Sequence, residues 1–386
     1  MATLFFVIGL MCLLTASHPF TTYPWSLIAL AVFFPKRGTS LARLPDAQLS
    51  CAICVCAYNE ECVIERKILN LLAIRNREPG LEILIYVDAA TDKTSDILRA
   101  YLEHIDYIHF ASERHGKTHG MNLLASKAKA SLLIFTDANV IMDMECVRDF
   151  KRHFADIEVG CVSGNLVYTN DAASVTATSG SIYWRFEEAL KKLESESGST
   201  MGADGSVFAI RKALHQPPPD YAIDDMFVSL TILCAGYRVI QVTDARAYEE
   251  CVTSRSEEYR RKKRIACQAF NVHRLMWRRL RQLDKLTLYK YVSHKLIRWF
   301  TIYLLAIAVI AFEASLLAAG YRRVALLLPC GVALTFTLGT MLSVKCFVQI
   351  TDIMRAFLGT GVGIFLSLRG EHYQTWAPAE SIRRGQ

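Results

Sequence analysis

The chain has 386 residues, a formal net charge of +7 at pH 7 and 52% hydrophobic residues. This length allows one large domain or two ordinary ones, so core size does not limit stability. The hydrophobic fraction exceeds that of average soluble proteins, and the mean hydropathy is positive. Because the excess lies at the two ends of the chain, the composition excludes an ordinary soluble protein and indicates a membrane protein with a soluble middle.

The N-terminal residues 2–34 are largely apolar, with a break around His18 and Pro19. Neither half reaches the roughly 20 residues that a spanning helix needs. We therefore expect one long or kinked helix, or one span followed by an interfacial piece. A cleaved signal peptide is the alternative, although no basic segment precedes the apolar run. Lys36 and Arg37 follow it, so the positive-inside rule places the next domain in the cytoplasm.

From about residue 50 to residue 250, strand-like apolar runs alternate with helical patterns. The strand-like runs are CAICVCAY, LEILIYVDA, YIHFAS and SLLIFTDA, and helices are expected at 61–74, 95–102 and 121–128. Such alternation predicts a mostly parallel sheet with crossover helices, in an α/β fold. Ligands of these sheets bind at the carboxyl ends of the strands.

Polar side chains follow three of these strands, where we expect a site. They are Tyr58, Asn59 and Glu60 after the first strand, Asp88 after the second, and Asp137 and Asn139 after the fourth. The same sequence is rich in cysteine, with twelve in all. Strand alternation places Cys54 and Cys56 on one face and Cys51 on the other, which suits small buried side chains better than zinc ligands. We expect free thiols in a reducing cytoplasm.

Three further apolar stretches lie near the C-terminus, at residues 296–319, 324–344 and 346–368. The first two are long enough to span a membrane. The third contains Asp352 and Arg355, so it is either a span buried in a bundle or a helix in the interface. We favour the interfacial or re-entrant version, because it keeps Arg383 and Arg384 in the cytoplasm. Membrane lipids account for the net positive charge, and no pattern indicates nucleic-acid binding.

The motifs CAYNEE, YVDAATDKTSD, SERHGKTHGMN and FTDAN, in this order, resemble the nucleotide-binding half of family 2 glycosyltransferases with the GT-A fold. The resemblance continues through SIYWRFEEALKKLES, GADGSVFAIRK, AIDDMFVSLTILCAGYRV and EEYRRKKRI. The membrane segments resemble those of bacterial members that make extracytoplasmic polysaccharides. These resemblances imply five parts: a membrane segment 1–37, a GT-A domain 50–274, an amphipathic interfacial segment 275–295, membrane helices 296–368 and a cytoplasmic tail 369–386.

The resemblance assigns donor binding to the first strand ends and to the R-x-G-K loop. The base and ribose of a nucleotide sugar would meet Tyr58, Glu60 and Asp88, since carboxylates accept hydrogen bonds from base N–H and ribose hydroxyl groups. Arg114 and Lys117 would lie against the nucleotide at a helix N-terminus, which attracts anions. This loop lacks the spacing of a P-loop. Turn formation, helix capping and a solvated basic loop remain alternatives.

The same resemblance implies a divalent ion, Mg²⁺ or Mn²⁺, at an Asp-x-Asp element that bridges the donor diphosphate. Here the element is Asp137 and Asn139, and the amide oxygen of Asn139 can coordinate but brings no charge. Arg261 and Arg264 share a helix face, so one could close over the diphosphate while the neighbouring basic residues meet lipid headgroups. A wholly lipid-facing basic run is the alternative.

The acidic pair in AIDDMF occupies the place of the family's catalytic pair. This implies Asp225 as general base, with Asp224 orienting it, and direct attack predicts inversion at the anomeric carbon. Helix capping by the pair is the alternative. The acceptor sugar would lie above the segment Gly202, Ala203, Asp204 and Gly205, where small side chains allow the backbone to approach the ligand closely. Trp184 could offer its ring face to the sugar, or it could be a buried packing residue.

The sequence therefore predicts a hexosyltransferase of the inner (plasma) membrane, with several membrane passes and a cytoplasmic catalytic domain. It would move a sugar from a UDP-sugar to a polysaccharide or lipid-linked acceptor. A processive synthase that extrudes its polymer is an alternative. The processive interpretation lacks support because Gln268 does not begin a Q-x-x-R-W motif. A polymer channel would also need more membrane helices, from a partner subunit or a homo-oligomer. A catalytically silent membrane scaffold is the second alternative.

Overall fold

The computed structural model describes residues 1–33, 49–169, 175–252, 254–376 and 378, without the side chains of 175–182. Lys36, Arg37, Arg383 and Arg384, on which the predicted cytoplasmic location depends, lie outside these described residues.

An eight-stranded mixed sheet forms the centre of the protein, in the order β3-β2-β1-β4-β7-β6-β8-β5. Its strands are β1 Cys51–Ala57, β2 Glu82–Val87, β3 Tyr107–Phe110, β4 Leu132–Asp137, β5 Ile141–Met142, β6 Val159–Tyr168, β7 Val207–Arg211 and β8 Arg238–Glu249. Strands β3, β2, β1 and β4 are parallel, and β7 runs antiparallel between β4 and β6. The predicted α/β class is confirmed, with a mixed sheet.

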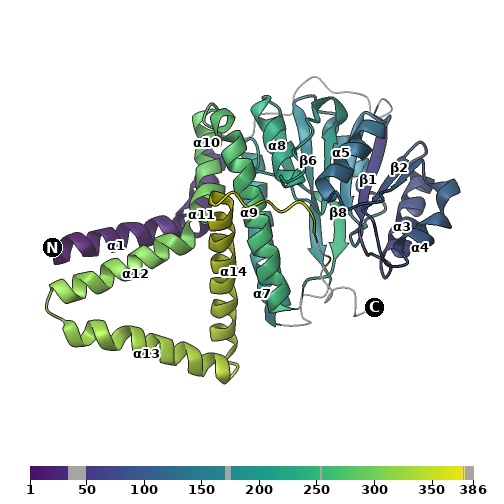
Figure 1. Cartoon of the computed structure of the whole chain (residues 1–386). Helices are drawn as coiled ribbons and strands as arrows, with labels where there is room; N and C mark the ends of the chain where they lie inside the picture. The colour runs from purple at the N-terminus through teal and green to yellow at the C-terminus, as the bar shows by residue number, and fades with distance from the viewer. Residues whose placement is uncertain (34–48, 170–174, 253, 377, 379–386) are drawn as a thin grey trace.

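Helices cover both faces of this sheet (Figure 1). They are α3 Ile64–Arg77, α4 Thr94–Arg99, α5 Lys117–Lys127, α6 Cys146–Phe154, α7 Val175–Glu196, α8 Asp224–Cys234 and α9 Arg255–Leu280. Alternate residues of β1 enter two hydrophobic clusters: Ile53 and Val55 pack with α3, α4 and α6, whereas Cys54 and Cys56 pack with α5, α8 and α9. All twelve cysteines are free, as predicted.

The register of the parallel strands brings their ends to one edge. Ala57 pairs with Val87, and Cys56 pairs with Asp137, so β1, β2 and β4 end almost level. Strands buried on both faces need continuous apolar sequences, which explains why each polar residue appears directly after the last apolar one. The predicted donor residues therefore lie along a single edge of the sheet.

The N-terminal apolar stretch forms two helices, α1 Ala2–Ser17 and α2 Thr22–Phe33, separated by the 3₁₀ turn His18–Phe20 that contains Pro19. Helix α1 lies beside a C-terminal helix, α12 Thr301–Ala318, and projects away from the sheet, while α2 packs against α7 (Figure 1). Of the two expectations, one span followed by a further piece describes this arrangement better than one long helix, and the interfacial location of that piece stays a prediction.

Buried charges join α2 and α7 to the π-helical turn η5, Val292–Leu296. The His294 ring lies between Glu187, at 2.9 Å, and Glu194, at 2.8 Å. Tyr23 donates from its hydroxyl to Glu194 at 2.5 Å, and Arg298 donates to Glu187 at 2.5 Å. Since unpaired charges are costly in an interior, this network fixes the orientation of α2 on the domain.

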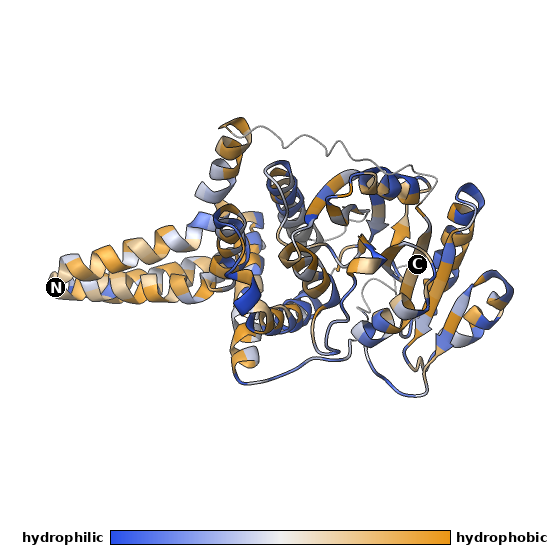
Figure 2. Cartoon of the chain, turned by 90° about the horizontal axis from the view of Figure 1, so that it is seen from above, coloured by the Kyte–Doolittle hydropathy of each residue, from blue (hydrophilic) through white to orange (hydrophobic). Residues whose placement is uncertain are grey.

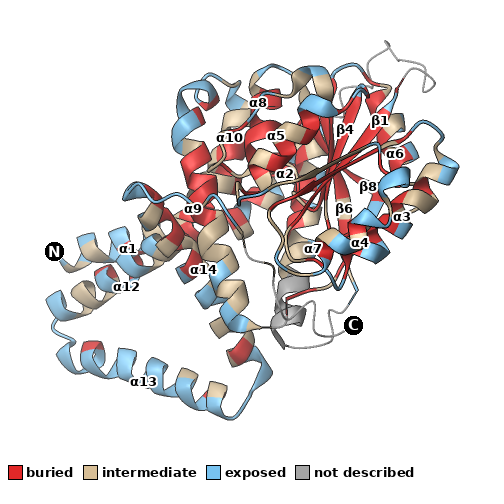
Figure 3. Ribbon diagram, turned by 45° about the vertical axis from the view of Figure 1, so that its right-hand side comes forward, coloured by how far each residue is buried: buried red, intermediate tan, exposed pale blue. Residues whose placement is uncertain are grey.

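The C-terminal part contains α10 Lys285–Tyr291, α11 Ile297–Trp299, α12, α13 Arg322–Met341 and α14 Lys345–Leu368. Within the described residues, four helices are long and apolar enough to cross a membrane: those that begin at Ala2, Thr301, Arg322 and Lys345. The helices that project from the domain are strongly hydrophobic (Figure 2) and α13 is mostly exposed (Figure 3). Exposed apolar surface of this extent is typical of a region that contacts lipid or another protein.

Helix α14 differs from the other three, because it lies along α9 and crosses the direction of α1 and α12 (Figure 1). Gly363 allows this close packing, since a Cβ there would lie 2.8 Å from the Cβ of Ala266. Asp352 forms an ion pair with Arg255 of α9 at 2.9 Å. The face away from α9 exposes Ile353 and Leu358.

Two predicted boundaries differ from the structure. Helix α9 continues without a break from Arg255 to Leu280, past the predicted end of the catalytic domain at residue 274. The predicted interfacial segment 275–295 is divided between the end of α9, the short helix α10 and part of η5. Tertiary packing against the domain, with Tyr291 wholly buried, accounts for this division.

Candidate active site

The loops that follow β1 and β2 hold each other through side-chain to main-chain hydrogen bonds. Asn59 accepts from the N–H of Thr91 at 2.8 Å, and Asp92 accepts from the N–H of Glu61 at 3.0 Å. Asn59 and Ala89 each have φ +51°, a left-handed conformation that is costly for Ala and is found mostly at functional sites. Asp92 also accepts from the N–H of Thr94 at 3.0 Å, so it is a turn-forming residue in this structure.

Glu60 and Tyr58 occupy different environments in the first loop. Glu60 is 3% exposed at the start of α3, and its N–H donates to Thr94 at 2.8 Å. Tyr58 is partly exposed, and the guanidinium of Arg114 lies over its ring at 3.4 Å from the centre. Tyr58 can therefore contact a ligand through its ring, whereas Glu60 is positioned mainly beneath the surface.

Asp88 is wholly buried and holds the R-x-G-K loop in place. It accepts from the main-chain N–H of His115 at 2.7 Å and of Gly116 at 3.1 Å, and pairs with Arg114 at 3.3 Å. Gly116 has φ +93°, which a residue with a side chain rarely adopts. Asp88 therefore shapes the loop, and its direct contact with a base or ribose stays a prediction.

Lys117 begins α5 and lies between two carboxylates of the site. Its Nζ is 2.7 Å from Asp137 and 3.7 Å from Asp224. Burial opposes the charge of Lys117, but the attraction of Asp137 and Asp224 outweighs it and raises its pKa. The lysine therefore stays protonated and joins the end of β4 to the start of α8.

The acidic pair lies in the first turn of α8, next to Lys117. Asp224 is buried, whereas Asp225 is partly exposed and accepts from the N–H of Met226 at 2.5 Å. Burial and the neighbouring Asp224 raise the pKa of Asp225 to about 7, against the effect of Lys117. A Cβ at Gly205 would lie 2.7 Å from Asp225 Oδ2, so this glycine makes room for the carboxylate.

The predicted metal residues lie at the end of β4. Asn139 donates its amide N–H to Glu249 at 2.9 Å, which leaves the amide oxygen to accept or coordinate. Burial raises the pKa of Glu249 to about 7. No group of three His, Cys, Asp or Glu in the described part of the chain could hold a metal by itself. Two oxygen donors, on Asp137 and Asn139, fit an ion that takes its other ligands from a diphosphate.

Behind this loop, Lys67 of α3 is fully buried and was not identified from the sequence. It donates to Thr136 Oγ1 at 3.1 Å and to the carbonyl of Val140 at 2.5 Å. Burial lowers the pKa of Lys67 to about 7, although Asp137 favours its charged form. Lys67 thus fastens the loop that carries Asp137. A lysine within an amphipathic helix gives no signal of this role.

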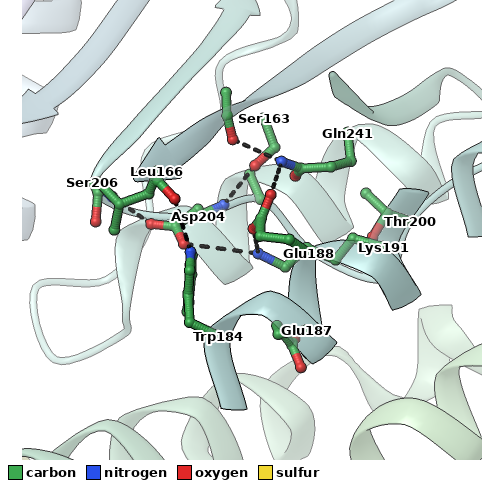
Figure 4. Close-up of polar contacts among 12 residues, drawn as sticks. Ser163, Leu166, Trp184, Glu187, Glu188, Lys191, Thr200, Asp204, Ser206 and Gln241 are labelled. Atoms are coloured by element: carbon green, nitrogen blue, oxygen red, sulfur yellow. Dashed lines mark hydrogen bonds and ion pairs between the residues drawn. The ribbon is translucent and has the colours of Figure 1, made fainter. Parts of the chain in front are cut away.

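On the acceptor side, Asp204 lies in the loop before β7, with its carboxylate turned inward (Figure 4). It is 8% exposed, accepts from the N–H of Ser206 at 2.7 Å, and lies 3.7 Å from Lys191. Its own N–H donates to Ser163 Oγ at 3.0 Å. These contacts shape the loop from Gly202 to Gly205, which the resemblance places under the acceptor.

Lys191 of α7 connects this loop to a second buried acid, Glu188, at 3.3 Å (Figure 4). Burial opposes the lysine charge, but Glu188 and Asp204 raise its pKa. Burial raises the pKa of Glu188 to about 7, and Gln241 donates to it at 2.5 Å. The spacing of these residues in the sequence gave no sign of this network.

Trp184 is a packing residue more than an exposed sugar platform. Its Nε1 donates to the carbonyl of Leu166 at 3.0 Å (Figure 4), and its ring meets that of Tyr168 edge-on, with the centres 5.9 Å apart. The Lys191 ammonium lies 4.8 Å from the ring centre. Of the two predicted roles for Trp184, the structure favours the buried one.

Gly202 and the basic helix α9 complete the site. Gly202 has φ +136°, and a Cβ there would lie 3.9 Å from Nζ of Lys295. Arg264 donates to Gln268 at 3.1 Å, and burial lowers its pKa, while the acidic residues of the site oppose that shift. Burial also disfavours charge on Arg261, but Tyr168 and other acidic neighbours raise its pKa. Both arginines therefore lie within the electrostatic reach of the site.

Comparison with known proteins gives a family and a fold. Residues 52–216 match the sequence model of glycosyl transferase family 2. No curated protein sequence matches the chain. The solved structure of the mannosyltransferase PcManGT from Pyrobaculum calidifontis, in complex with GDP-Man and Mn²⁺, aligns with a TM-score of 0.70 and 22% identity, over 94% of this chain and 99% of its own.

Two other solved structures align less closely. TarS 1–349 from S. aureus, in complex with UDP-GlcNAc, has a TM-score of 0.40 and 13% identity, over 84% of this chain and 93% of its own. GalNAc-T7 with UDP, GalNAc and Mn²⁺ has a TM-score of 0.44 and 13% identity, over 73% of this chain and 58% of its own. Residues 52–216 therefore match the model of glycosyl transferase family 2, and the likeness to PcManGT shows that the chain has a GT-A-like fold.

Proposed function

We propose that the protein is an inverting hexosyltransferase, which moves a sugar from a nucleotide donor to a polysaccharide or lipid-linked acceptor at the cytoplasmic face of the plasma membrane. The family match supports a glycosyltransferase with a nucleotide-sugar donor. The observation that carries the proposal is the position of Asp225: a carboxylate of raised pKa that adjoins Asp224, which Lys117 joins to Asp137 at the donor edge.

The donor binds along the ends of β1, β2 and β4 in this proposal. The ring of Tyr58 offers a flat surface for the base, while the main-chain N–H groups of the R-x-G-K loop are held in position by Asp88. Lys117 and the arginines of α9 supply positive charge for the diphosphate. UDP is the expected nucleotide, with GDP as a competitor because PcManGT was solved with GDP-Man.

Catalysis requires a base for the acceptor hydroxyl. A raised pKa makes the ionised Asp225 a stronger base than an ordinary carboxylate, and a pKa of about 7 leaves the ionised form dominant only above neutral pH. Burial and the negative charge of Asp224 raise the pKa of Asp225, and the positive charge of Lys117 lowers it. The proton of the hydroxyl passes to Asp225 as its oxygen attacks the anomeric carbon and the nucleoside diphosphate leaves, which inverts the configuration.

A divalent ion, Mg²⁺ or Mn²⁺, fits the oxygen donors on Asp137 and Asn139, with Glu249 orienting the amide. When bound, the ion would neutralise negative charge on the leaving diphosphate. Mn²⁺ was present with the nucleotide sugar in PcManGT.

The membrane arrangement is part of the proposal. We assign α1, α12 and α13 as spans and α14 as an interfacial helix, because α14 packs along α9 of the catalytic domain and crosses the other helices (Figure 1). Three spans are few for a polymer channel, which argues against a processive synthase unless partner subunits or a homo-oligomer supply more. The intact acidic pair argues against a silent scaffold.

Transfer assays with the purified protein in detergent test this function directly. A panel of UDP- and GDP-sugars is incubated with Mg²⁺, Mn²⁺ or EDTA, and release of nucleoside diphosphate is measured. We expect release from one donor, lost with EDTA. Release that persists in EDTA would remove the metal from the proposal, and binding of nucleotide without release from any donor, with acceptor lipids present, would support the scaffold instead.

A further inference from the structure

The last described residues return to the donor edge of the sheet. After α14, the chain passes in an extended path over α9 and ends beside the R-x-G-K loop (Figure 1). Residues 371–376, which we call the return segment, make two hydrogen bonds to the donor loop, between residues 259 and 262 positions apart in the sequence. Neither the family match nor the predicted donor residues include this segment.

Contacts with α9 hold the first part of the return segment. Asn271 donates to the carbonyl of Glu371 at 3.0 Å, and Gln268 donates to the carbonyl of Tyr373 at 2.7 Å. The ring of His372 lies 4.4 Å from that of Tyr221, shortly before the catalytic pair. Main-chain carbonyls held by buried side chains fix the path of a segment independently of its own sequence.

The second part of the return segment contacts the donor loop itself. Gln374 donates from its side chain to the carbonyl of His115 at 3.2 Å. Its own main-chain carbonyl lies against the Cα of Gly116, where no Cβ would fit. Arg114 donates to the carbonyl of Trp376 at 2.6 Å. The segment and the loop are therefore complementary at the level of the backbone.

Trp376 lies beside the Tyr58 ring and the Arg114 guanidinium. The guanidinium lies 3.4 Å from the centre of the Tyr58 ring and 5.5 Å from that of Trp376, and the two rings meet edge to face, with their centres 6.0 Å apart and their planes inclined at 71°. A planar cation on the face of Tyr58 occupies the kind of position that a nucleobase takes, because both stack on aromatic faces. Trp376 is partly exposed, so its ring can be reached from solvent.

We propose that the return segment is part of the donor site, and that Trp376 borders the position of the nucleobase on the face of Tyr58. This inference rests on the proposed function. The base replaces the Arg114 guanidinium over Tyr58, while the main-chain contacts of residues 371–374 keep Trp376 in place. If the segment instead blocked the donor site, the same contacts would weaken nucleotide binding. The direction in which Trp376→Ala changes the Kd for nucleotide therefore distinguishes the two roles.

The test is nucleotide binding by the full-length protein in detergent. Calorimetry with UDP and with GDP, each with Mn²⁺, is applied to the wild type, Trp376→Ala, Trp376→Phe and the control Trp277→Ala. Trp277 is an exposed tryptophan on α9. We expect Trp376→Ala to raise the Kd by about 10-fold or more, as loss of one stacking ring does elsewhere, with Trp376→Phe close to the wild type and the control unchanged.

Tryptophan fluorescence gives a second readout that does not depend on the alanine variant being stable. Nucleotide should quench the emission of the wild type and of Trp277→Ala, and should quench Trp376→Phe much less. An unchanged or lower Kd in Trp376→Ala would overturn the inference, and a lower one would identify the segment as a plug. If the wild type bound neither nucleotide, the proposed function would fail first, and this inference with it.

Discussion

The two halves of the sheet hold their functional groups by different means. At the ends of β1 and β2, main-chain N–H groups and short loops carry the contacts, with Asp88 as the central acceptor. Beside β6, β7 and β8, buried ion pairs hold the functional groups in place. Lys191 pairs with Glu188 on the same helix and with Asp204 in the loop before β7. The donor half therefore depends on local geometry, and the acceptor half depends on a balance of buried charge.

Lys117 connects the two halves. It begins α5 on the donor side and reaches both Asp137 and Asp224. We therefore expect a substitution at Lys117 to lower both turnover and stability. A substitution within one half of the sheet should change only one of these two properties. The four predictions below test this distinction, beginning with the largest expected effect.

Asp225→Asn should lower the turnover by about 10³-fold, because a positioned general base contributes on that order. The thermal stability and nucleotide binding should stay near those of the wild type. Asp220→Asn is the matched control, since Asp220 lies shortly before the pair and contacts His119 at the surface at 3.4 Å. The turnover of purified protein with saturating donor is the measurement. If Asp224→Asn abolished turnover and Asp225→Asn did not, the assigned base would be wrong.

Lys117→Gln should lower the free energy of unfolding by about 3 kcal/mol, because it leaves the carboxylates of Asp137 and Asp224 without their cation. The corresponding fall in Tm is about 6–12 °C. Lys127→Gln at the exposed end of the same helix is the control and should change stability by less than about 0.5 kcal/mol. Thermal unfolding measures both.

Adding Asp137→Asn to Lys117→Gln sharpens this test. The second change removes one of the uncompensated charges, so part of the lost stability should return while activity stays low. Equal stability of Lys117→Gln and Lys127→Gln would show that the two halves are not joined through this lysine.

The pH dependence of turnover should report the ionisation of Asp225. Burial and Asp224 raise the pKa of Asp225 to about 7, and the ionised form is the active base. Turnover should therefore fall about 10-fold per pH unit below pH 7 and level off above it. Asp224→Asn removes the neighbouring charge, so this limb should move to lower pH. A limb that stays in place in Asp224→Asn would contradict the coupling of the pair.

Glu249→Ala should have the smallest effect, which is a weaker affinity for the Mn²⁺ complex of the nucleotide by about 10-fold, as loss of an orienting neighbour does in metal sites. Glu249→Gln should behave like the wild type, since its amide oxygen can still accept from Asn139. Calorimetry with Mn²⁺ and nucleotide distinguishes the variants. Identical binding by both variants would show that the orientation of Asn139 does not matter.

The same difference between the halves explains what could be predicted from the sequence. The donor edge was predictable because a buried strand must end where its apolar run ends, so Asp88 and Asp137 had to lie at strand ends. The α/β fold, the free cysteines and the helical C-terminal stretches followed from similar local patterns. The role of Asp88 as a loop anchor did not follow, because main-chain N–H groups are invisible in a residue pattern.

The contacts on the acceptor side could not be predicted from spacing. Lys191, Glu188 and Asp204 come from a helix and a loop that meet through the fold alone, and Glu249 reaches Asn139 across 110 residues. The return segment illustrates the same limit, since Trp376 meets Tyr58 from the opposite end of the chain. Long-range contacts of this type depend on tertiary packing, which no short window of sequence contains.

The glycine contact between α14 and α9 has a consequence for acceptor selection. With Gly363 against Ala266 and the Asp352–Arg255 ion pair nearby, these two helices cannot slide or tilt freely against each other. If α14 rests in the lipid interface as proposed, the catalytic carboxylate stands at a constant height above the bilayer. The protein would then select acceptors by the distance of their hydroxyl group from the bilayer, and would glycosylate those whose hydroxyl reaches that height.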